Sequence, residues 1–237
     1  MANKAIIFIH GFMGRSRQFE EIVSSLEGCG EDLKLCVLDG HEKKTFQEFR
    51  QSSAKSWQAG ADKFIDDLRA DYDEILLVGH SMGGLIAVQS AIACPEKIKG
   101  IVAIGFPVKI RLTPAWFKNN ILASKPPREG ESEYVAAARR LGGVHMDKPS
   151  DYFRTMPNNM QFMSMRSRTG KELYKLSVPL SVINMERDEI VAPGTQKFVK
   201  KKLPNANFTL LKESGHFLFR GNEVTFMANE IRRMLDL

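Results

Sequence analysis

The fold of this sequence is decided by the stretch Ile75-Leu76-Leu77-Val78-Gly79-His80-Ser81-Met82-Gly83-Gly84. Its four leading apolar residues predict a short strand, and the apolar spacing that follows predicts a helix. Between strand and helix lies a G-x-S-x-G pentapeptide centred on Ser81. A serine on so sharp a turn has a strained backbone with a positive φ, and side chains two residues before or after it would collide. Strand, pentapeptide and helix together predict that Ser81 is a nucleophile.

Around this stretch, short apolar runs alternate with helical patterns. The runs are mostly continuous, so we expect strands that are covered on both faces. Strands separated by helices imply right-handed crossovers and a parallel sheet. We therefore expect an α/β protein with a doubly wound, mostly parallel six-stranded sheet. Strands are expected over residues 5–10, 33–39, 75–79, 100–105, 180–185 and 208–211, and helices over 19–26, 47–68, 85–93, 195–202 and 223–235.

One interval, from residue 107 to residue 176, breaks this alternation. It shows no convincing strand, and prolines and a Gly-Gly pair punctuate it. Amphipathic pieces predict short helices within it. An ordered insertion of this length is usually functional, and in open α/β sheets ligands bind at the carboxyl ends of the strands. We expect a helical cap at 107–176, inserted before the last two strands, and a core domain formed by 1–106 and 177–237.

Composition places the chain among compact globular proteins. Its 237 residues are 43% hydrophobic and 26% charged, with a net charge of +6 and a pI near 9.2. The basic residues are scattered except for Lys200-Lys201-Lys202, which falls at a predicted helix end without interleaved aromatic residues. We therefore expect no nucleic-acid partner. Three cysteines without a C-x-x-C pair fit a reduced, cytoplasmic protein.

The start of the sequence gives no sign of a targeting segment. An apolar strand follows directly after Met1-Ala2-Asn3-Lys4, which leaves no room for a signal peptide. No stretch approaches the roughly 18 apolar residues that a membrane span needs. We expect a cytoplasmic protein without a membrane span, present as a monomer or a weak homo-oligomer.

A nucleophilic serine needs a base to take its proton, and the base needs an acid to orient it. His216 follows the last predicted strand, and this position favours it over the four other histidines. Asp188 follows the preceding strand, with Glu186 and Glu189 as close rivals. Asp188 is preferred because an apolar pair anchors the chain two residues later. The resulting order, Ser81, Asp188, His216, is the one expected of a nucleophile elbow in this kind of sheet.

The reaction of such a serine also requires two N–H donors for the oxyanion that forms. The backbone N–H of Met82 is one candidate, because it lies at the positive end of the helix after Ser81. The second candidate is the N–H of Phe12, in the H-G-F-M-G loop of residues 10–14. A plain strand-to-helix turn explains the glycines of this loop equally well, and both interpretations are compatible.

These motifs resemble those of the α/β-hydrolase superfamily. The H-G-F-x-G loop, the G-H-S-M-G-G elbow, the R-D-E acid loop and the S-G-H segment are most similar to small bacterial carboxylesterases of the monoacylglycerol-lipase-like group. The similarity covers residues 4–105 and 179–237. It implies a catalytic triad of Ser81, His216 and Asp188, an oxyanion hole from Phe12 and Met82, and no metal or organic cofactor. One departure is the D-G-H-E loop of residues 39–42, where many relatives have a second glycine, so we expect that loop to differ in shape.

The resemblance implies a serine hydrolase, specifically a lipase-like carboxylesterase. Its expected partners are small-molecule esters with small to medium acyl chains, monoacylglycerols included. Phe12, Met82 and Phe217 flank catalytic positions and are expected to bind substrate. The insertion adds methionines that either line the acyl pocket or simply pack the cap onto the core, namely Met146, Met156, Met160, Met163 and Met165.

Other functions remain open at this stage. A lyase of the menaquinone-pathway type shares a similar H-G-F-x-G start and would use the triad for proton abstraction. It would need cations to grip a polycarboxylate, and the insertion supplies Arg111, Arg128, Arg139, Arg140, Arg154, Arg166 and Arg168. A thioesterase or peptidase would share the acyl-enzyme chemistry. A binding module that kept the scaffold is the least favoured alternative, because all three triad positions are intact.

Overall fold

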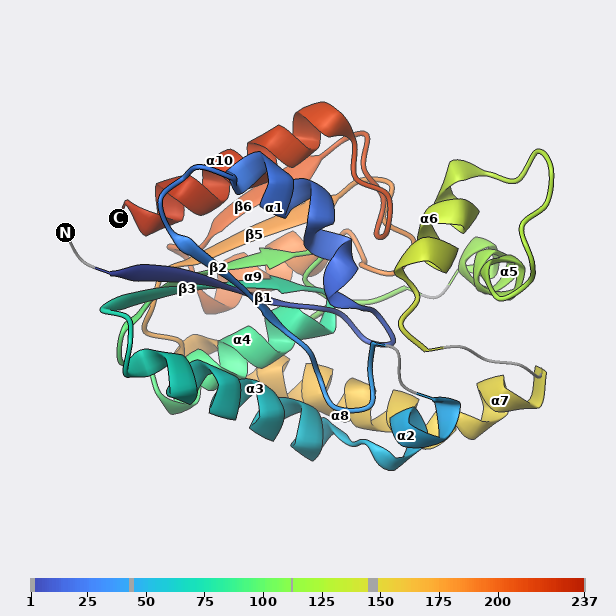
Figure 1. The fold of residues 1–237 in the computed structure, drawn as a ribbon, viewed down its shortest axis with the longest axis horizontal. Helices are drawn as coiled ribbons and strands as arrows, with labels where there is room; N and C mark the ends of the chain where they lie inside the picture. The colour runs from blue at the N-terminus through green and yellow to red at the C-terminus, as the bar shows by residue number, and fades with distance from the viewer. Residues whose placement is uncertain (1–2, 43–44, 112, 145–148, 237) are drawn as a thin grey trace.

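A six-stranded sheet forms the centre of the molecule (Figure 1). The computed structural model describes residues 3–42, 45–111, 113–144 and 149–236. Every pair of neighbouring strands is parallel, in the order β2-β1-β3-β4-β5-β6, which confirms the predicted sheet. The strands are β1 (Lys4–Ile9), β2 (Asp32–Cys36), β3 (Glu74–His80), β4 (Ile98–Ile104), β5 (Leu180–Met185) and β6 (Asn207–Leu211).

Helices cover both faces of this sheet because each central strand sends alternate side chains to opposite faces. On β1, Ile6 and Phe8 join a core cluster under α1 (Glu20–Leu26) and α10 (Gly221–Leu235). Ile7 and Ile9 join the larger cluster on the other face. Figure 1 shows α1 and α10 above the sheet and α3 and α4 below it. The helices of the second face are α3 (Ala54–Arg69), α4 (Met82–Ala93), α8 (Met156–Glu172) and α9 (Thr195–Lys202).

The helix expected over residues 47–68 is wrong as a single element. The structure divides it into α2 (Phe46–Gln51) and α3, with an extended backbone at Ser52 and Ser53 between them. The Ser53 side chain accepts the N–H of Ser56 and caps α3, while the Ser52 hydroxyl accepts the indole N–H of Trp57. Serine favours such caps over helix interiors, because its hydroxyl competes for backbone groups.

The strand expected over residues 33–39 is also shorter than predicted. It ends at Cys36, and beyond it the N–H of Leu38 donates to Nε2 of His10. The N–H of His41 then donates to the carbonyl of Leu38. These contacts turn the chain away from the ladder, because the backbone groups after Cys36 find partners outside the sheet.

The interval between β4 and β5 consists of helices joined by irregular segments, with one isolated antiparallel bridge between Ile110 and Val191. It contains α5 (Pro114–Ala123), α6 (Glu133–Leu141), α7 (Pro149–Arg154), α8 and the 3-10 turn η2 (Leu173–Lys175). In Figure 1, α5 and α6 extend past the carboxyl ends of the strands, whereas α8 runs alongside the helices of the lower face. The contacts of α8 with α3 and α4 place it in that helical layer. The division into cap and core at residues 107 and 176 stays a prediction.

No helix in the described part of the chain has both the length and the apolarity needed to cross a membrane.

The packing of α4 on β1 gives a first prediction. A Cβ added at Gly83 would lie 1.8 Å from the carbonyl oxygen of Ile9, so Gly83→Ala forces the helix away from the strand. We expect a loss of about 3 kcal/mol in the free energy of unfolding. Gly60→Ala is the matched control, because a Cβ at this position in α3 meets nothing within 4 Å. That variant should gain about 0.5–1 kcal/mol from helix propensity. Urea unfolding of both variants measures the difference, and a Gly83→Ala protein as stable as the wild type would contradict the packing described.

Candidate active site

Ser81 lies at the turn between β3 and α4, as its pentapeptide predicts. Its φ is 52° and its ψ is −119°, and the residue is 7% exposed. Its N–H donates to the carbonyl of Ile104 on β4. A Cβ at Gly79 would stand 2.4 Å from the N atom of Gly84, so only glycine fits there. The strained serine is therefore held by strand, helix and neighbouring strand together.

His216 and Asp188 form a buried hydrogen-bonded pair. Nδ1 of His216 lies 2.7 Å from Oδ2 of Asp188, and both side chains are almost fully buried. The other carboxylate oxygen accepts the N–H groups of Ile190 and Val191, each at 2.7 Å. Burial pushes the pKa of Asp188 upward, but His216 and these two N–H groups outweigh it and hold that pKa below its ordinary value. The carboxylate is thus kept ionised and orients the imidazole, with the proton on Nδ1 and Nε2 left as the acceptor.

The two rival acids lie differently. Glu186 is exposed, and burial raises the pKa of Glu189, which makes its carboxyl a poorer anion. The hydrogen bond to the His216 ring comes from Asp188. Among the three acids considered from the sequence, the structure therefore brings Asp188 to the histidine.

The imidazole of His216 packs beside the nucleophile turn. Its ring centroid lies 4.7 Å from that of His80, the residue that precedes Ser81. A Cβ at Gly105, which has a φ of 59°, would lie 3.3 Å from the His216 ring. The segments that carry Ser81, Asp188 and His216 therefore meet where β3, β4, β5 and β6 end. Their assignment as a catalytic triad is taken up below as a proposal.

The loop after β1 approaches the same turn. A Cβ at Gly11 would stand 3.0 Å from Cβ of Ser81, so glycine allows this approach. Among the described residues, the backbone N–H groups of Phe12 and Met82 have no hydrogen-bond partner. Met82 begins α4, where the helix dipole adds positive potential. Within the described residues, no acceptor competes for the two N–H groups chosen from the sequence, and their role as oxyanion donors is taken up below as a proposal.

Aromatic side chains, more than methionines, surround this region. The ring of Phe12 stacks on Phe162 of α8 at 5.3 Å and meets Phe49 and Trp57 edge-on. The ring of Phe217 lies 4.8 Å from that of His216. Of the methionines in the insertion, Met165 is buried, whereas three are exposed and Met146 lies outside the described residues; the exposed ones are Met156, Met160 and Met163. The apolar wall beside the loop is therefore aromatic.

Two buried histidines that the sequence analysis passed over hold the loop after β1. Nε2 of His41 accepts the N–H of Met13, and its Nδ1 lies 2.9 Å from the carbonyl oxygen of Asp39. Nδ1 of His10 lies 2.9 Å from the carbonyl oxygen of Gly11. Burial lowers the pKa of His10 to about 4 and that of His41 to about 3, so both rings are neutral. Their position at the ends of the first two strands was the signal available in the sequence.

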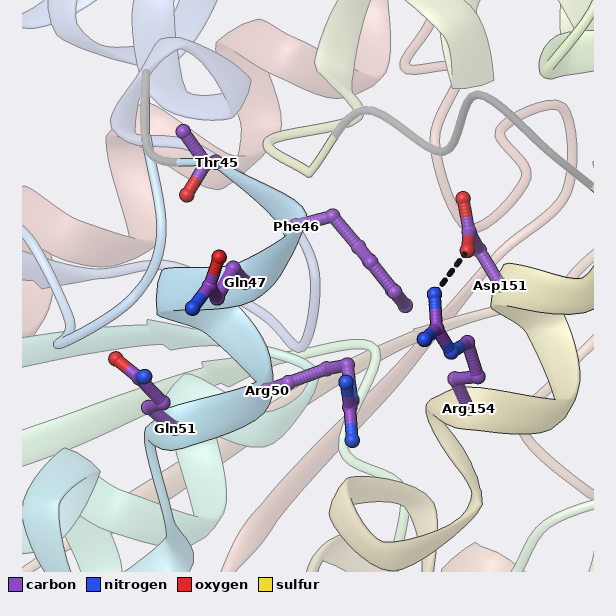
Figure 2. Close-up of a pocket in the computed structure, with 7 residues that line it drawn as sticks. All are labelled: Thr45, Phe46, Gln47, Arg50, Gln51, Asp151 and Arg154. Carbon is purple, nitrogen blue, oxygen red and sulfur yellow. Dashed lines mark ion pairs between the residues drawn. The ribbon is translucent and has the colours of Figure 1, made fainter.

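A separate cavity of about 650 Å³ opens between α2 and α7 (Figure 2). Figure 2 shows Arg154 directed toward Asp151, with which it pairs at 3.5 Å. Of its lining residues, only Arg154 was considered from the sequence, as a cation for the lyase alternative, and none belongs to the residues around Ser81. The cavity is lined by Thr45, Phe46, Gln47, Arg50, Gln51, Asp151 and Arg154. Within the described ranges, no group of three or more His, Cys, Asp or Glu side chains is arranged to hold a metal ion.

The buried imidazoles predict how stability depends on pH. The folded-state pKa values of His10, His41 and His80 lie near 4, 3 and 3, below the ordinary value of 6.5. Below that ordinary value the unfolded chain binds protons that the folded chain does not, so stability is lost as the pH falls. We expect the free energy of unfolding to drop between about pH 6.5 and pH 5 by up to 1.4 kcal/mol per pH unit for each ring. Urea unfolding at several pH values tests this, and a flat profile in that window would contradict it.

Comparisons with known proteins agree with this architecture. Lipase 1 of Psychrobacter immobilis is 23% identical over 238 residues, which cover 91% of this chain and 72% of that lipase. Monoglyceride lipase of Homo sapiens is 32% identical over 106 residues, which cover 43% of this chain and 34% of the human protein. A solved structure described as a metagenome-derived lipolytic enzyme has a TM-score of 0.74 at 19% identity, covering 100% of this chain and 95% of that one. At this identity the structural likeness shows the shared α/β-hydrolase fold.

A match to a family model shows which protein family the chain belongs to. The model described as serine aminopeptidase, S33, matches residues 1–135, more than half of the sequence. The matched part contains the loop after β1, the nucleophile turn and Ser81. The chain therefore belongs to the serine aminopeptidase S33 family of α/β-hydrolases.

Proposed function

We propose that this protein is a serine carboxylesterase that acts through an acyl-enzyme on Ser81. The observation that carries the proposal is the buried Asp188–His216 pair, whose imidazole packs on His80, the residue before a serine with a φ of 52°. Such a constellation serves acyl transfer, in which a base activates a hydroxyl and an acid orients the base. The names of the curated relatives, a lipase and a monoglyceride lipase, support an ester as the substrate.

The reaction follows from the roles of these residues. Nε2 of His216 takes the proton of the Ser81 hydroxyl as the oxygen attacks the ester carbonyl, and Asp188 stabilises the imidazolium. The N–H groups of Phe12 and Met82 donate hydrogen bonds to the developing oxyanion, and each is worth about 3–4 kcal/mol of the barrier. His216 then gives the proton to the departing alcohol. Water activated by the same imidazole hydrolyses the acyl-enzyme and restores Ser81.

The preferred substrates are esters with small to medium acyl chains, monoacylglycerols included. Phe12, Met82 and Phe217 flank the reacting groups and supply apolar contacts to the acyl chain. The stacking of Phe12 on Phe162 extends this apolar wall from the loop after β1 to α8. Aromatic and apolar lining of this kind binds apolar chains without fixing one length.

Six of the seven arginines named in the insertion bind groups of the protein itself, which favours a hydrolase over the lyase alternative. Arg111 donates to the carbonyl of Asp188, and Arg166 donates to the carbonyl of Val108. Arg139 pairs with Glu131. Three more of these arginines form ion pairs with acidic side chains, namely Arg140 with Glu21, Arg154 with Asp151 and Arg168 with Glu172. These cations hold loops and helices in place, which leaves them poorly suited to grip a polycarboxylate.

Substitution of the serine tests the proposal directly. Ser81→Ala should reduce turnover of p-nitrophenyl butyrate to background and abolish labelling by a fluorophosphonate, because the nucleophile is gone. Ser90→Ala is the matched control, since it removes a buried serine from α4, the helix that follows Ser81, where its hydroxyl donates to Asp62. A Ser81→Ala protein with full activity would refute the mechanism. A wild-type protein that cleaves amino-acid p-nitroanilides but no ester would transfer the proposal from esters to peptides.

The choice of acid gives a second test. Asp188→Asn leaves the geometry intact but favours the wrong imidazole tautomer, so kcat should fall by roughly 10⁴-fold. Glu186→Gln, an exposed carboxyl in the same loop, should leave kcat unchanged. Steady-state kinetics on p-nitrophenyl butyrate compare the two. If Glu186→Gln lost activity and Asp188→Asn kept it, the acid would be misassigned.

A further inference from the structure

A buried glutamine joins the loop after β1 to the nucleophile turn. Gln18 lies in the 3-10 turn η1 (Ser16–Phe19) and is 4% exposed. Its amide oxygen accepts the N–H of Gly11 at 2.8 Å and lies 2.9 Å from Nδ1 of His80. Gly11 precedes the candidate oxyanion donor Phe12, and His80 precedes Ser81. A single oxygen atom therefore contacts both the loop of the proposed donor Phe12 and the turn that carries Ser81.

The contacts continue from His80 to the loop of the proposed base. Nε2 of His80 lies 2.9 Å from the carbonyl oxygen of His216. Burial lowers the pKa of His80 to about 3, so the ring is neutral and carries a single proton. That proton is donated either from Nδ1 to Gln18 or from Nε2 to the His216 carbonyl, and the contact with Gln18 is a hydrogen bond in the Nδ1-protonated tautomer. The ¹⁵N shifts of the His80 ring therefore show which of its two nitrogens carries the proton, and so which of the two oxygens it binds.

Neighbouring glycines leave the space that this amide and ring fill. A Cβ at Gly14 would stand 2.7 Å from Nε2 of Gln18, and a Cβ at Gly11 would stand 3.2 Å from Nδ1 of His80. The amide of Gln18 is thus enclosed by the very loop that it binds. A change in its length or polarity must move that loop relative to His80, because buried groups pack without slack.

We propose that Gln18 is a positioning residue, which fixes the oxyanion loop against the nucleophile turn through Gly11 and His80. This inference rests on the proposed function, because it assigns Gln18 a part in the same reaction. Gln18 touches no reacting atom. It acts by keeping the N–H of Phe12 and the hydroxyl of Ser81 at the separation that the transition state requires.

Gln18→Met tests this role, because methionine matches the side chain in length and lacks the amide oxygen. We expect kcat for p-nitrophenyl butyrate to fall by about 100-fold, the cost of roughly 1 Å of misplacement, with KM within about threefold of the wild type. The matched control is Gln89→Met, which removes a buried glutamine of α4 that has no hydrogen bond to either loop among the described residues. Both variants lose a buried amide, but only Gln18→Met loses the contacts with Gly11 and His80. The control should therefore keep the wild-type kcat.

The outcomes separate cleanly. A folded Gln18→Met protein with wild-type kcat overturns the proposal, as does an equal loss in Gln89→Met. If Gln18→Met does not fold, Gln18→Asn replaces it, since this amide is shorter by one methylene and leaves the contact unmade. The same loss is expected, and wild-type kcat again overturns the proposal.

An NMR measurement makes the proposal independent of the esterase assignment. If the wild type turns over no ester, the proposed function fails while the positioning contact can still be tested. The ¹⁵N signals of the His80 ring should then shift in Gln18→Asn and stay unchanged in Gln89→Met. An unchanged His80 ring in Gln18→Asn would overturn the contact.

Discussion

The nucleophile turn can approach the loop after β1 because glycines stand where the two backbones meet. Gly83 lies against the carbonyl of Ile9, and Gly11 lies against Ser81 itself. Any side chain at either position would separate the nucleophile turn and the helix that begins at Met82 from β1 and the loop that carries Phe12. The proposed oxyanion hole depends on this small spacing, because its two donors, Phe12 and Met82, lie on the two segments that the glycines bring together. The strained φ of Ser81 is the cost of that arrangement, and the surrounding strands and helix hold it.

Burial sets the electrostatics around this turn. Three imidazoles, those of His10, His41 and His80, are neutral because desolvation lowers their pKa values. Their ring nitrogens form contacts with backbone groups of neighbouring segments and so hold these segments together. Asp188 stays ionised in the same interior, because His216 and two backbone N–H groups compensate its burial. The negative charge is thereby placed on the far side of the His216 ring, where it stabilises the imidazolium that the proposed reaction creates.

The two ends of the insertion between β4 and β5 pack against different parts of the molecule. Its last long helix, α8, joins the layer of α3 and α4 and brings Phe162 to the ring of Phe12. Its earlier helices, α5 and α6, pack on each other past the strand ends (Figure 1). The backbone links Gly143 to Met13 through an N–H donated to the Met13 carbonyl, so this part of the insertion also holds the loop after β1. Substrate preference in the proposed esterase therefore depends on elements that also support the oxyanion donors.

The sequence by itself determined the parallel sheet, the nucleophile turn and the places where chemistry is expected. Apolar runs, helical spacing and the glycine pattern around Ser81 are local signals, and five strands end within two residues of their predicted ends. The sequence patterns did not predict the helix break at Ser53 or the early end of β2. The break depends on side-chain caps, and the end of β2 depends on the distant His10 ring. The pairing of His216 with Asp188 could be anticipated from strand order. The contacts of Gln18 with His80 and of His80 with His216 span 62 and 136 positions, and no periodicity encodes them. Only the packed tertiary structure brings such groups together, because burial and hydrogen bonding between distant segments are decided by the fold as a whole.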